Sequence, residues 1–342
     1  MRLLIFGVIP VHGGNSMKHW IRFLVLILCS AIFGCSQQTA SVDDQSAGDE
    51  VGGQRTIGIS VQTLQNPFFK LIADTVESEA GKHGWTVLKR DAEEKIEVQK
   101  DQVKEFIVKK VDAIVLCPRD SEAIGASVRE ANQAGIPVFT VDTVCADKEA
   151  EVVFHVGTDN FQGGEIAGQA MIDALGEAGG KVVVLEFKDV DSCIDRVNGF
   201  TKVVNAHNET AANKIEIVGH YDSKGNDELG QNATREALIS NSDLAGIFAI
   251  NDPAALGAYA ALEAEGKQDS VVVIGFDGQP EGKVAVGEGK LFDTPTQFPG
   301  KMAVESVNAI VKYFDGEKIE PASMLILTAP YRKADADKDA AQ

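Results

Sequence analysis

The sequence predicts an α/β fold built from two doubly wound domains. From Arg55 onward, short apolar runs rich in Val and Ile alternate with longer amphipathic segments. This alternation is typical of parallel strands that are buried on both faces and covered by helices. About ten such units follow one another, more than one sheet of ordinary width holds. Two expected strands adjoin across a loop within 141–157, which indicates a boundary between two similar domains.

The expected elements follow one another with little linker between them. Asn66 stands where a helix cap is expected and Pro67 where the first helical turn begins. Apolar runs predict strands at 56–61, 85–90, 112–117, 136–142, 152–157, 181–187, 214–221, 246–250 and 270–277. Amphipathic periodicity predicts helices at 67–82, 93–109, 121–134, 160–175, 192–207, 228–240 and 253–265.

The N-terminal region reads as an export signal. A basic stretch precedes the apolar run 23–33, which ends in Ile-Phe-Gly-Cys at Cys35 and is followed by a polar segment. The apolar run is shorter than the roughly 20 residues that a membrane-spanning helix needs. This arrangement is typical of a bacterial lipoprotein, so we expect a signal peptide over 1–34, cleavage before Cys35 and a lipid on that cysteine. Met17 opens a better signal peptide than Met1, and we interpret residues 1–16 as a mis-called start.

The segment 35–54 has almost no large apolar residues and no periodicity, so we expect a flexible tether between lipid and domain. The lipid would hold the exported protein at a membrane, in the periplasm or on the cell surface. The formal net charge of −19 argues against a nucleic-acid partner, whose phosphates require a basic face.

Three cysteines stay in the mature chain. Cys117 ends an apolar run and is expected to be a small core residue. One disulfide is possible in an oxidising compartment, but nothing in the sequence selects the pair, so the redox state of Cys145 and Cys193 stays open. Their spacing indicates no zinc site.

Polar and aromatic side chains gather directly after the expected strands, where open parallel sheets bind their ligands. Carboxylates and amides pair with vicinal hydroxyls, an arginine supplies a fork of donors, and aromatic rings cover the apolar face of a sugar. The set therefore predicts a sugar site, although Asn66 taken alone favours a simple helix cap and Asn251 taken alone also fits one. The candidate ligand-binding residues are Asn66, Phe68, Phe69, Asp142, Thr143, Arg196, Tyr221, Asn251, Asp277 and Gln297.

Five motifs extend this interpretation: TLQNPFFKLIADTVESEA, ANQAGIPVFTVD, TDNFQGGEIAG, AINDPAALGAYAALEAEGK and VVVIGFDGQPEG. With them, the chain from Thr56 to Lys333 resembles the periplasmic sugar-binding proteins of bacterial ABC importers, specifically the ribose-binding group of the type I periplasmic binding protein fold. The resemblance implies two Rossmann-like domains with a ligand cleft between them, joined by three crossovers. We expect the first domain at 55–157 and 300–324 and the second at 158–299 and 325–333. The charged, repetitive residues 334–342 are expected to be disordered.

The resemblance also implies a role for each candidate residue. The amides, Asp142, Asp277 and Arg196 would hydrogen-bond the sugar, whereas Phe68, Phe69 and Tyr221 would stack on it. Ribose binders carry an arginine where this chain has Thr143. The identity of the ligand therefore stays open between ribose, another pentose, a hexose and a sugar-like polyol. Gln62, near the end of the first strand, is also expected to face the cleft.

The resemblance implies an extracytoplasmic solute-binding protein, monomeric, that closes on a monosaccharide and delivers it to the permease of an ABC transporter. The alternative is a subunit that presents the sugar to a chemoreceptor or sensor kinase. An enzyme is not expected, because the chain lacks a nucleophile elbow and a P-loop. GGEIAG, a weak glycine match, is expected to let helices pack closely. We expect no cofactor and no metal.

Overall fold

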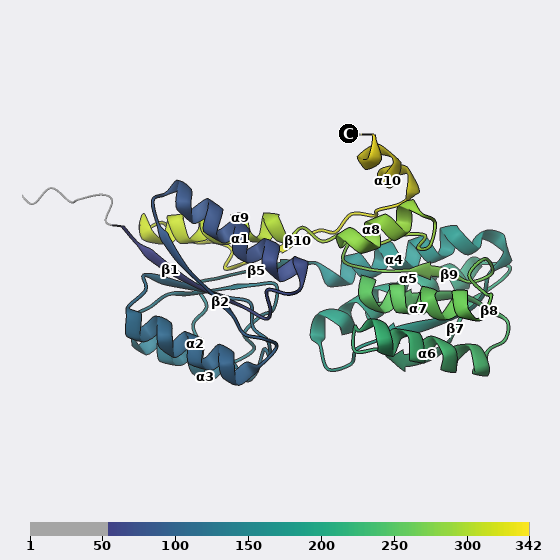
Figure 1. Ribbon diagram of the computed structural model, residues 1–342, viewed down its shortest axis with the longest axis horizontal. Helices are drawn as coiled ribbons and strands as arrows, with labels where there is room; N and C mark the ends of the chain where they lie inside the picture. The colour runs from purple at the N-terminus through teal and green to yellow at the C-terminus, as the bar shows by residue number, and fades with distance from the viewer. Residues whose placement is uncertain (1–53, 342) are drawn as a thin grey trace, which may run out of the picture. The chain divides into compact units, whose positions relative to one another are not determined.

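The computed structural model describes residues 54–341 (Figure 1). The expected signal peptide, Cys35 and all of the tether except Gln54 lie outside the described residues. No helix within 54–341 combines the length and the apolar character that crossing a membrane requires.

The first domain contains a parallel sheet with helices on both of its faces (Figure 1). The strand order is β10-β5-β4-β3-β1-β2. The strands are β1 (Thr56–Val61), β2 (Thr86–Asp91), β3 (Ala113–Leu116), β4 (Val138–Val141), β5 (Phe154–Thr158) and β10 (Ser323–Ile326). Helices α1 (Pro67–Lys82) and α9 (Pro299–Phe314) cover one face, and α2 (Ile96–Lys109) and α3 (Gly125–Gln133) cover the other.

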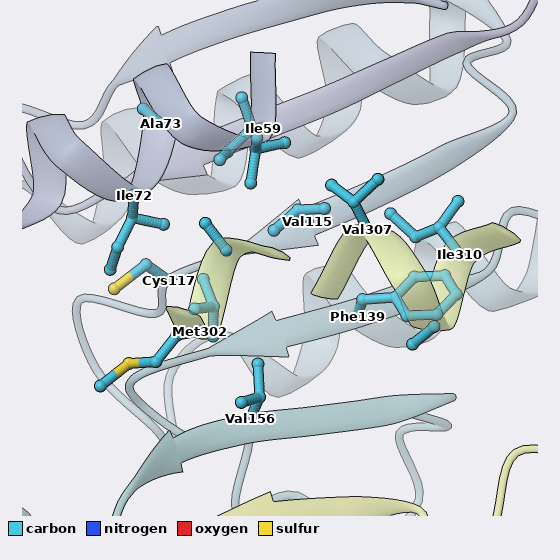
Figure 2. Packing of buried hydrophobic residues seen from close by; sticks show 14 of the residues in the cluster. Ile59, Ile72, Ala73, Val115, Cys117, Phe139, Val156, Met302, Val307 and Ile310 are labelled. Carbon is cyan, nitrogen blue, oxygen red and sulfur yellow. The ribbon is translucent and has the colours of Figure 1, made fainter. Parts of the chain in front are cut away.

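The core of the first domain joins segments from both ends of the chain. Ile59 of β1 and Ile72 of α1 pack with Phe139 of β4 and Met302 of α9 (Figure 2), and all four are fully buried. The packing explains why α9, far along the chain, returns to this domain. Cys117 is also fully buried there, which confirms the expected core residue. Cys117, Cys145 and Cys193 are all free thiols.

The second domain repeats the architecture with a parallel sheet in the order β7-β6-β8-β9. The strands are β6 (Gly180–Glu186), β7 (Ile215–Asp222), β8 (Leu244–Ala249) and β9 (Val272–Ile274). Helices α4 (Asn160–Leu175) and α5 (Asp191–Thr210) pack on one face, and α6 (Asp227–Ser240) and α7 (Asp252–Ala264) on the other. A 3-10 turn (Gly176–Ala178) follows α4, and α8 (Pro280–Gly287) follows β9.

Both sheets place their first strand between the second and the third. This 2-1-3-4 order creates a switch point at β1/β3 in one domain and at β6/β8 in the other. Ligands of such sheets bind beyond the carboxyl ends of the strands at the switch point. The predicted pair of doubly wound domains is therefore confirmed, and the topology fixes which strand ends carry the site.

Three crossings join the domains: after β5, before α9, and after β10. The sequence-based boundary before Leu325 is wrong, because β10 pairs with β5 through Ile326 and so belongs wholly to the first sheet. Side chains tie the crossings together. The hydroxyl of Thr158 donates to Gln297 Oε1 at 2.6 Å, and the backbone N–H of Thr328 donates to Gln162 Oε1 at 3.0 Å.

The C-terminal segment is not a disordered tail as the sequence suggested. Residues Lys333–Ala340 form helix α10, in which Asp335 accepts from the backbone N–H of Arg332 and Ala336 is buried. The hydroxyl of Tyr331 donates to Asp339 at 2.8 Å. A helix this short and polar is marginal by itself, so these tertiary contacts explain its formation.

Candidate functional site

The first domain places a chain of polar groups at the ends of β1, β3 and β4. Asp142 directly follows β4, and its Oδ2 accepts from the Thr143 hydroxyl at 3.3 Å and lies 3.8 Å from the Cys117 sulfur. The amide of Gln62 donates to Thr143 Oγ1 at 3.2 Å and to the Pro118 carbonyl at 2.9 Å. The carboxylate is therefore contacted from the ends of β3 and β4, and Gln62 at the end of β1 supports it through Thr143.

Asn66 is the N-cap of α1, and its Oδ1 accepts from the backbone N–H of Phe68 at 2.9 Å. Capping engages this oxygen, and the amide nitrogen is the group of Asn66 that can donate. Phe68 is buried in the core and Phe69 is half-buried against it, with the rings edge to face at a centroid distance of 5.2 Å. The structure thus gives Phe68 a core role and leaves Phe69 as the more accessible ring.

In the second domain, Arg196 is bound on several sides by the ends of other elements. Its Nε donates to Asn160 Oδ1 at 2.9 Å, and its NH1 donates to the Ile250 carbonyl at 2.7 Å and to Asp277 Oδ1 at 2.9 Å. The guanidinium also lies over the Phe276 ring, 3.9 Å from its centroid. These contacts fix the position of the guanidinium group.

Helices α4 and α5 position Arg196 by close backbone packing. A Cβ on Gly164 would clash with the backbone carbonyl of Arg196, and one on Gly199 would clash with the carbonyl of Phe161. Larger residues would push the helices apart and displace the arginine. Gly164 and Gly168 of GGEIAG thus serve helix packing, as the sequence predicted, whereas Gly163 leaves room for the Phe276 ring.

Asp277 follows β9 and collects three donors. Oδ1 accepts from Arg196 and from the Gln297 amide at 2.6 Å, while Oδ2 accepts from the Gln279 amide at 3.2 Å. Gln297 in turn accepts from Thr158 with its Oε1. The carboxylate is therefore linked through one glutamine to the first crossing between the domains.

Asn251 and Tyr221 have mainly structural contacts. Asn251 caps α7 by accepting from the backbone N–H of Ala254 at 3.1 Å, and its amide donates to the Gly225 carbonyl at 2.9 Å. Tyr221 is half-buried against the cluster formed with α6 and α7, and none of its described contacts reaches Arg196 or Asp277. The structure joins Arg196, Asp277 and Gln297 directly, but it does not join Tyr221 to them.

Both candidate aspartates have strained backbones. Asp142 has φ = 66° and Asp277 has φ = 102°, a region that residues other than glycine rarely adopt. Such strain costs on the order of 1–3 kcal/mol per residue. It persists only where surrounding contacts hold the residue in this conformation, and strained residues cluster at functional sites. Positive φ by itself does not mark the site, because Glu93, Glu94, Lys110 and Lys224 also have it, but it agrees with the candidate role of these two strand ends.

Burial raises the pKa of several carboxyl groups here. Asp142 has its pKa raised to about 6 by burial, with the Arg196 charge opposing the shift and the Asp277 charge adding to it. Burial also raises the pKa of Asp277, and the nearby Arg196 charge opposes this shift. Desolvated carboxylates of this kind accept strongly from hydroxyl donors and are typical of binding sites.

Several residues of the site were not among the sequence candidates. Gln62, named only as facing the cleft, donates to Thr143. Asn160 accepts from Arg196, and Thr158 donates to Gln297. Gln62 and Thr158 lie at strand ends, a signal that is visible in the sequence. Asn160 opens a helix directly after a strand, and only its contact with Arg196 reveals its part.

A family model described as a periplasmic binding protein domain matches residues 57–318. The chain belongs to this family. It is 35% identical over 266 residues to the ribose import binding protein RbsB of Escherichia coli (strain K12), covering 78% of this chain and 86% of the relative.

Solved structures show the same fold. A periplasmic solute-binding protein of an ABC transporter from Actinobacillus succinogenes, solved with bound D-allose, gives a TM-score of 0.76 at 29% identity and covers 83% of this chain and 100% of that chain. A solute-binding protein from Bacillus halodurans with bound myo-inositol gives 0.75 at 27% identity and covers 85% and 98%. The chain is thus similar to proteins that hold polyhydroxylated rings.

Proposed function

We propose that the protein is the extracytoplasmic solute-binding component of an ABC importer and binds one monosaccharide, ribose or a related pentose or hexose. The observation that carries the proposal is the buried Arg196–Asp277–Gln297 network. It offers a fixed guanidinium donor on α5 and a desolvated carboxylate after β9. Periplasmic binding proteins use such groups to exchange hydrogen bonds with sugar hydroxyls, and the family membership and the relatives' ligands support the same use here.

Closure of the two domains on the sugar would be the working step. Asp142, Thr143 and Asn66 belong to the first domain, whereas Arg196 and Asp277 belong to the second. A guest that bonds to both sets stabilises the closed state by its differential affinity for that state. We propose that the closed monomer then delivers the sugar to the permease.

The expected signal peptide over 1–34 supports a lipid anchor on the solute-binding protein. The basic stretch, the apolar run and Cys35 lie outside the described residues and are typical of exported lipoproteins. We propose that the mature protein begins at Cys35 and is held at a membrane by its lipid. Intact-mass measurement of membrane-extracted protein should show diacylglycerol on that cysteine, and a Cys35→Ser variant should appear in the soluble fraction.

The choice of sugar should depend on Thr143. Its hydroxyl accepts from Gln62 and donates to Asp142, so its hydrogen bonds are largely used within the protein. The arginine that ribose binders carry at this position would add a charged donor fork on the first-domain side. We infer that this site prefers a sugar that needs fewer hydrogen-bond donors from the first domain.

The function is tested by thermal denaturation of the wild-type protein with a panel of pentoses, hexoses and cyclic polyols. A ligand at a hundredfold excess over its dissociation constant should stabilise the folded protein by about 2.7 kcal/mol. In the same screen, Thr143→Arg should shift the preference toward ribose by roughly tenfold or more. If no member of the panel raises the melting temperature of either protein, the proposed function is wrong.

Sugar affinity should fall as the pH drops below about 6. Sugar hydroxyls donate to ionised Asp142, whose pKa is raised to about 6 by burial, so protonation removes an acceptor and competes with binding. The dissociation constant should rise by up to about tenfold per pH unit below that value, because proton uptake opposes ligand uptake. Isothermal titration at pH 7.5 and pH 4.5 measures the effect. Asp142→Asn should bind more weakly with a flatter profile, and equal wild-type affinity at both pH values would contradict the assignment.

A further inference from the structure

The loop that carries Asp277 is held in an unfavourable conformation by specific contacts. Asp277 has φ = 102° and Gly278 has φ = 65°. The backbone N–H of Asp277 donates to the Pro295 carbonyl at 3.0 Å, and the N–H of Gln297 donates to the Asp277 carbonyl at 3.0 Å. These two bonds hold one side of the loop, but they do not explain what fixes the two peptide units that follow.

A second buried carboxyl group lies directly behind those peptide units. Asp252, at the start of α7, is only 1% exposed. Its Oδ2 accepts from the backbone N–H of Gln279 at 2.7 Å, and its Oδ1 accepts from the Thr294 hydroxyl at 2.6 Å. Thr294 Oγ1 in turn accepts from the backbone N–H of Gly278 at 3.1 Å. Asp252 therefore holds both N–H groups that follow Asp277, one directly and one through Thr294.

Close packing of the backbone around Asp252 restricts the conformation of the loop. A Cβ on Gly282, in the first turns of α8, would clash with the Asp252 carboxyl, and a Cβ on Gly278 would clash with Thr296. A Cβ on Gly275 would come within 2.5 Å of Asp252 Oδ1. The backbone before and after Asp277 thus closes around this carboxyl group.

We propose that Asp252 is the positioning residue of the site: it sets the conformation of the 277–279 loop and thereby the sugar affinity of Asp277, without touching the sugar. The inference rests on the proposed sugar-binding function. It also separates the roles of two consecutive residues, because Asn251 caps α7 and faces Gly225 whereas Asp252 faces the back of the loop.

The protonation state of Asp252 suits this role. Burial, with the Asp277 charge adding to it, raises the pKa of Asp252 to about 8. The raised pKa means that the group carries less negative charge behind Asp277 than an exposed aspartate would. Asp252→Asn keeps nearly the same shape and one oxygen that can accept from the Gln279 N–H.

The first test compares Asp252→Ala with Asp252→Asn by isothermal titration with the sugar that stabilises the wild-type protein. Alanine leaves the Gln279 N–H and the Thr294 hydroxyl without their acceptors, so the affinity should fall roughly 10- to 100-fold. Asparagine restores an acceptor for Gln279, and the affinity should return to within about fivefold of the wild type. An Asp252→Ala protein that binds with wild-type affinity overturns the proposal.

Asp293 offers the matched control. It is a fully buried carboxyl group beside Thr294 in the chain, but its side chain binds Arg332 and the backbone N–H of Tyr331 instead of the loop. Asp293→Asn should lower the melting temperature and leave the dissociation constant within about twofold. If Asp293→Asn and Asp252→Ala weaken binding equally, the effect is general destabilisation and the positioning role is refuted.

A double-mutant cycle and amide exchange complete the design. In an Asp277→Asn background, Asp252→Ala should change the affinity by less than about threefold, because its effect acts through Asp277, whereas additive effects contradict the proposal. In the ligand-free protein, Asp252→Ala should accelerate exchange at Gly278 and Gln279 while leaving the first sheet unchanged. Unchanged exchange at these amides overturns the inference. Accelerated exchange without any sugar binding to the wild type instead refutes the proposed function and supports the positioning of the loop.

Discussion

Asp277→Ala is expected to abolish measurable sugar binding while both domains remain folded. The carboxylate is the shared acceptor of Arg196, Gln297 and Gln279, and its side chain is only 9% exposed. Losing a hydrogen bond from a sugar hydroxyl to this charged acceptor costs about 1.5–3 kcal/mol, which corresponds to roughly 10- to 150-fold in affinity for each bond lost. The fold should survive, because Arg196 keeps its bonds to Asn160 and to the Ile250 carbonyl. Circular dichroism and isothermal titration check both parts of the prediction.

Two further variants separate charge from shape. Asp277→Asn keeps the size of the side chain and one acceptor and tolerates the positive φ better than alanine does, so it should retain weak binding. Asp243→Ala removes an exposed carboxylate that pairs with Lys181 where β6 and β8 begin, away from the strand ends that carry the site. It should bind the sugar as the wild type does. Unchanged affinity in Asp277→Ala would defeat the assignment of the site.

The sequence predicted the repeated strand–helix units because their signals are local. Pro67 and Asn66 fix the start of α1, and the Val- and Ile-rich runs mark the buried parallel strands. α9 and β10 carry no local signal that tells which domain they join, and only the family resemblance assigned 300–324 to the first domain. β10 is fixed in the first sheet by pairing with β5, more than 160 residues earlier in the chain. The crossing after Ile326 was therefore expected two residues too early, because the end of β10 depends on this distant pairing.

The candidate site shows the same division between local and tertiary information. Asp142 and Asp277 were predicted because each stands at the end of an expected strand of a doubly wound sheet, and Gln297 because it follows the segment LFDTPT. Tyr221 also lies near a strand end, yet its ring packs against the core formed with α6 and α7. Asp252 shows the opposite case, since an acidic residue in the first turn of a helix is ordinarily accounted for by the helix dipole. Only its burial against Gly282 and its bond to Gln279 reveal a different role.

Arg332→Met is expected to destabilise the second domain strongly. Arg332 donates from Nε to Asp293 at 2.6 Å and pairs with Asp173 at 2.8 Å, and Asp293 has no exposed surface. Methionine keeps an apolar stem but leaves Asp293 as a buried charge without a cation. Breaking a buried pair costs about 3–5 kcal/mol, and because the Arg332 side chain is 34% exposed we expect about 2–4 kcal/mol. Differential scanning calorimetry should show a melting temperature lower by roughly 5–12 °C.

The pH dependence of this loss identifies its cause. Burial raises the pKa of Asp293 to about 6, with Arg332 opposing the shift, so the folded protein holds this proton to a higher pH than the unfolded chain does. The stability linked to the proton is present below the ordinary pKa and is lost as the pH rises through the folded value. Without Arg332 the folded pKa rises further, so the stability difference between wild type and Arg332→Met should be larger at pH 8 than at pH 5. Adding Asp293→Asn to Arg332→Met removes the unpaired buried charge and should recover part of the lost stability. A deficit that is equal at both pH values and unaffected by Asp293→Asn would show that Arg332 acts by packing α10 rather than by neutralising Asp293.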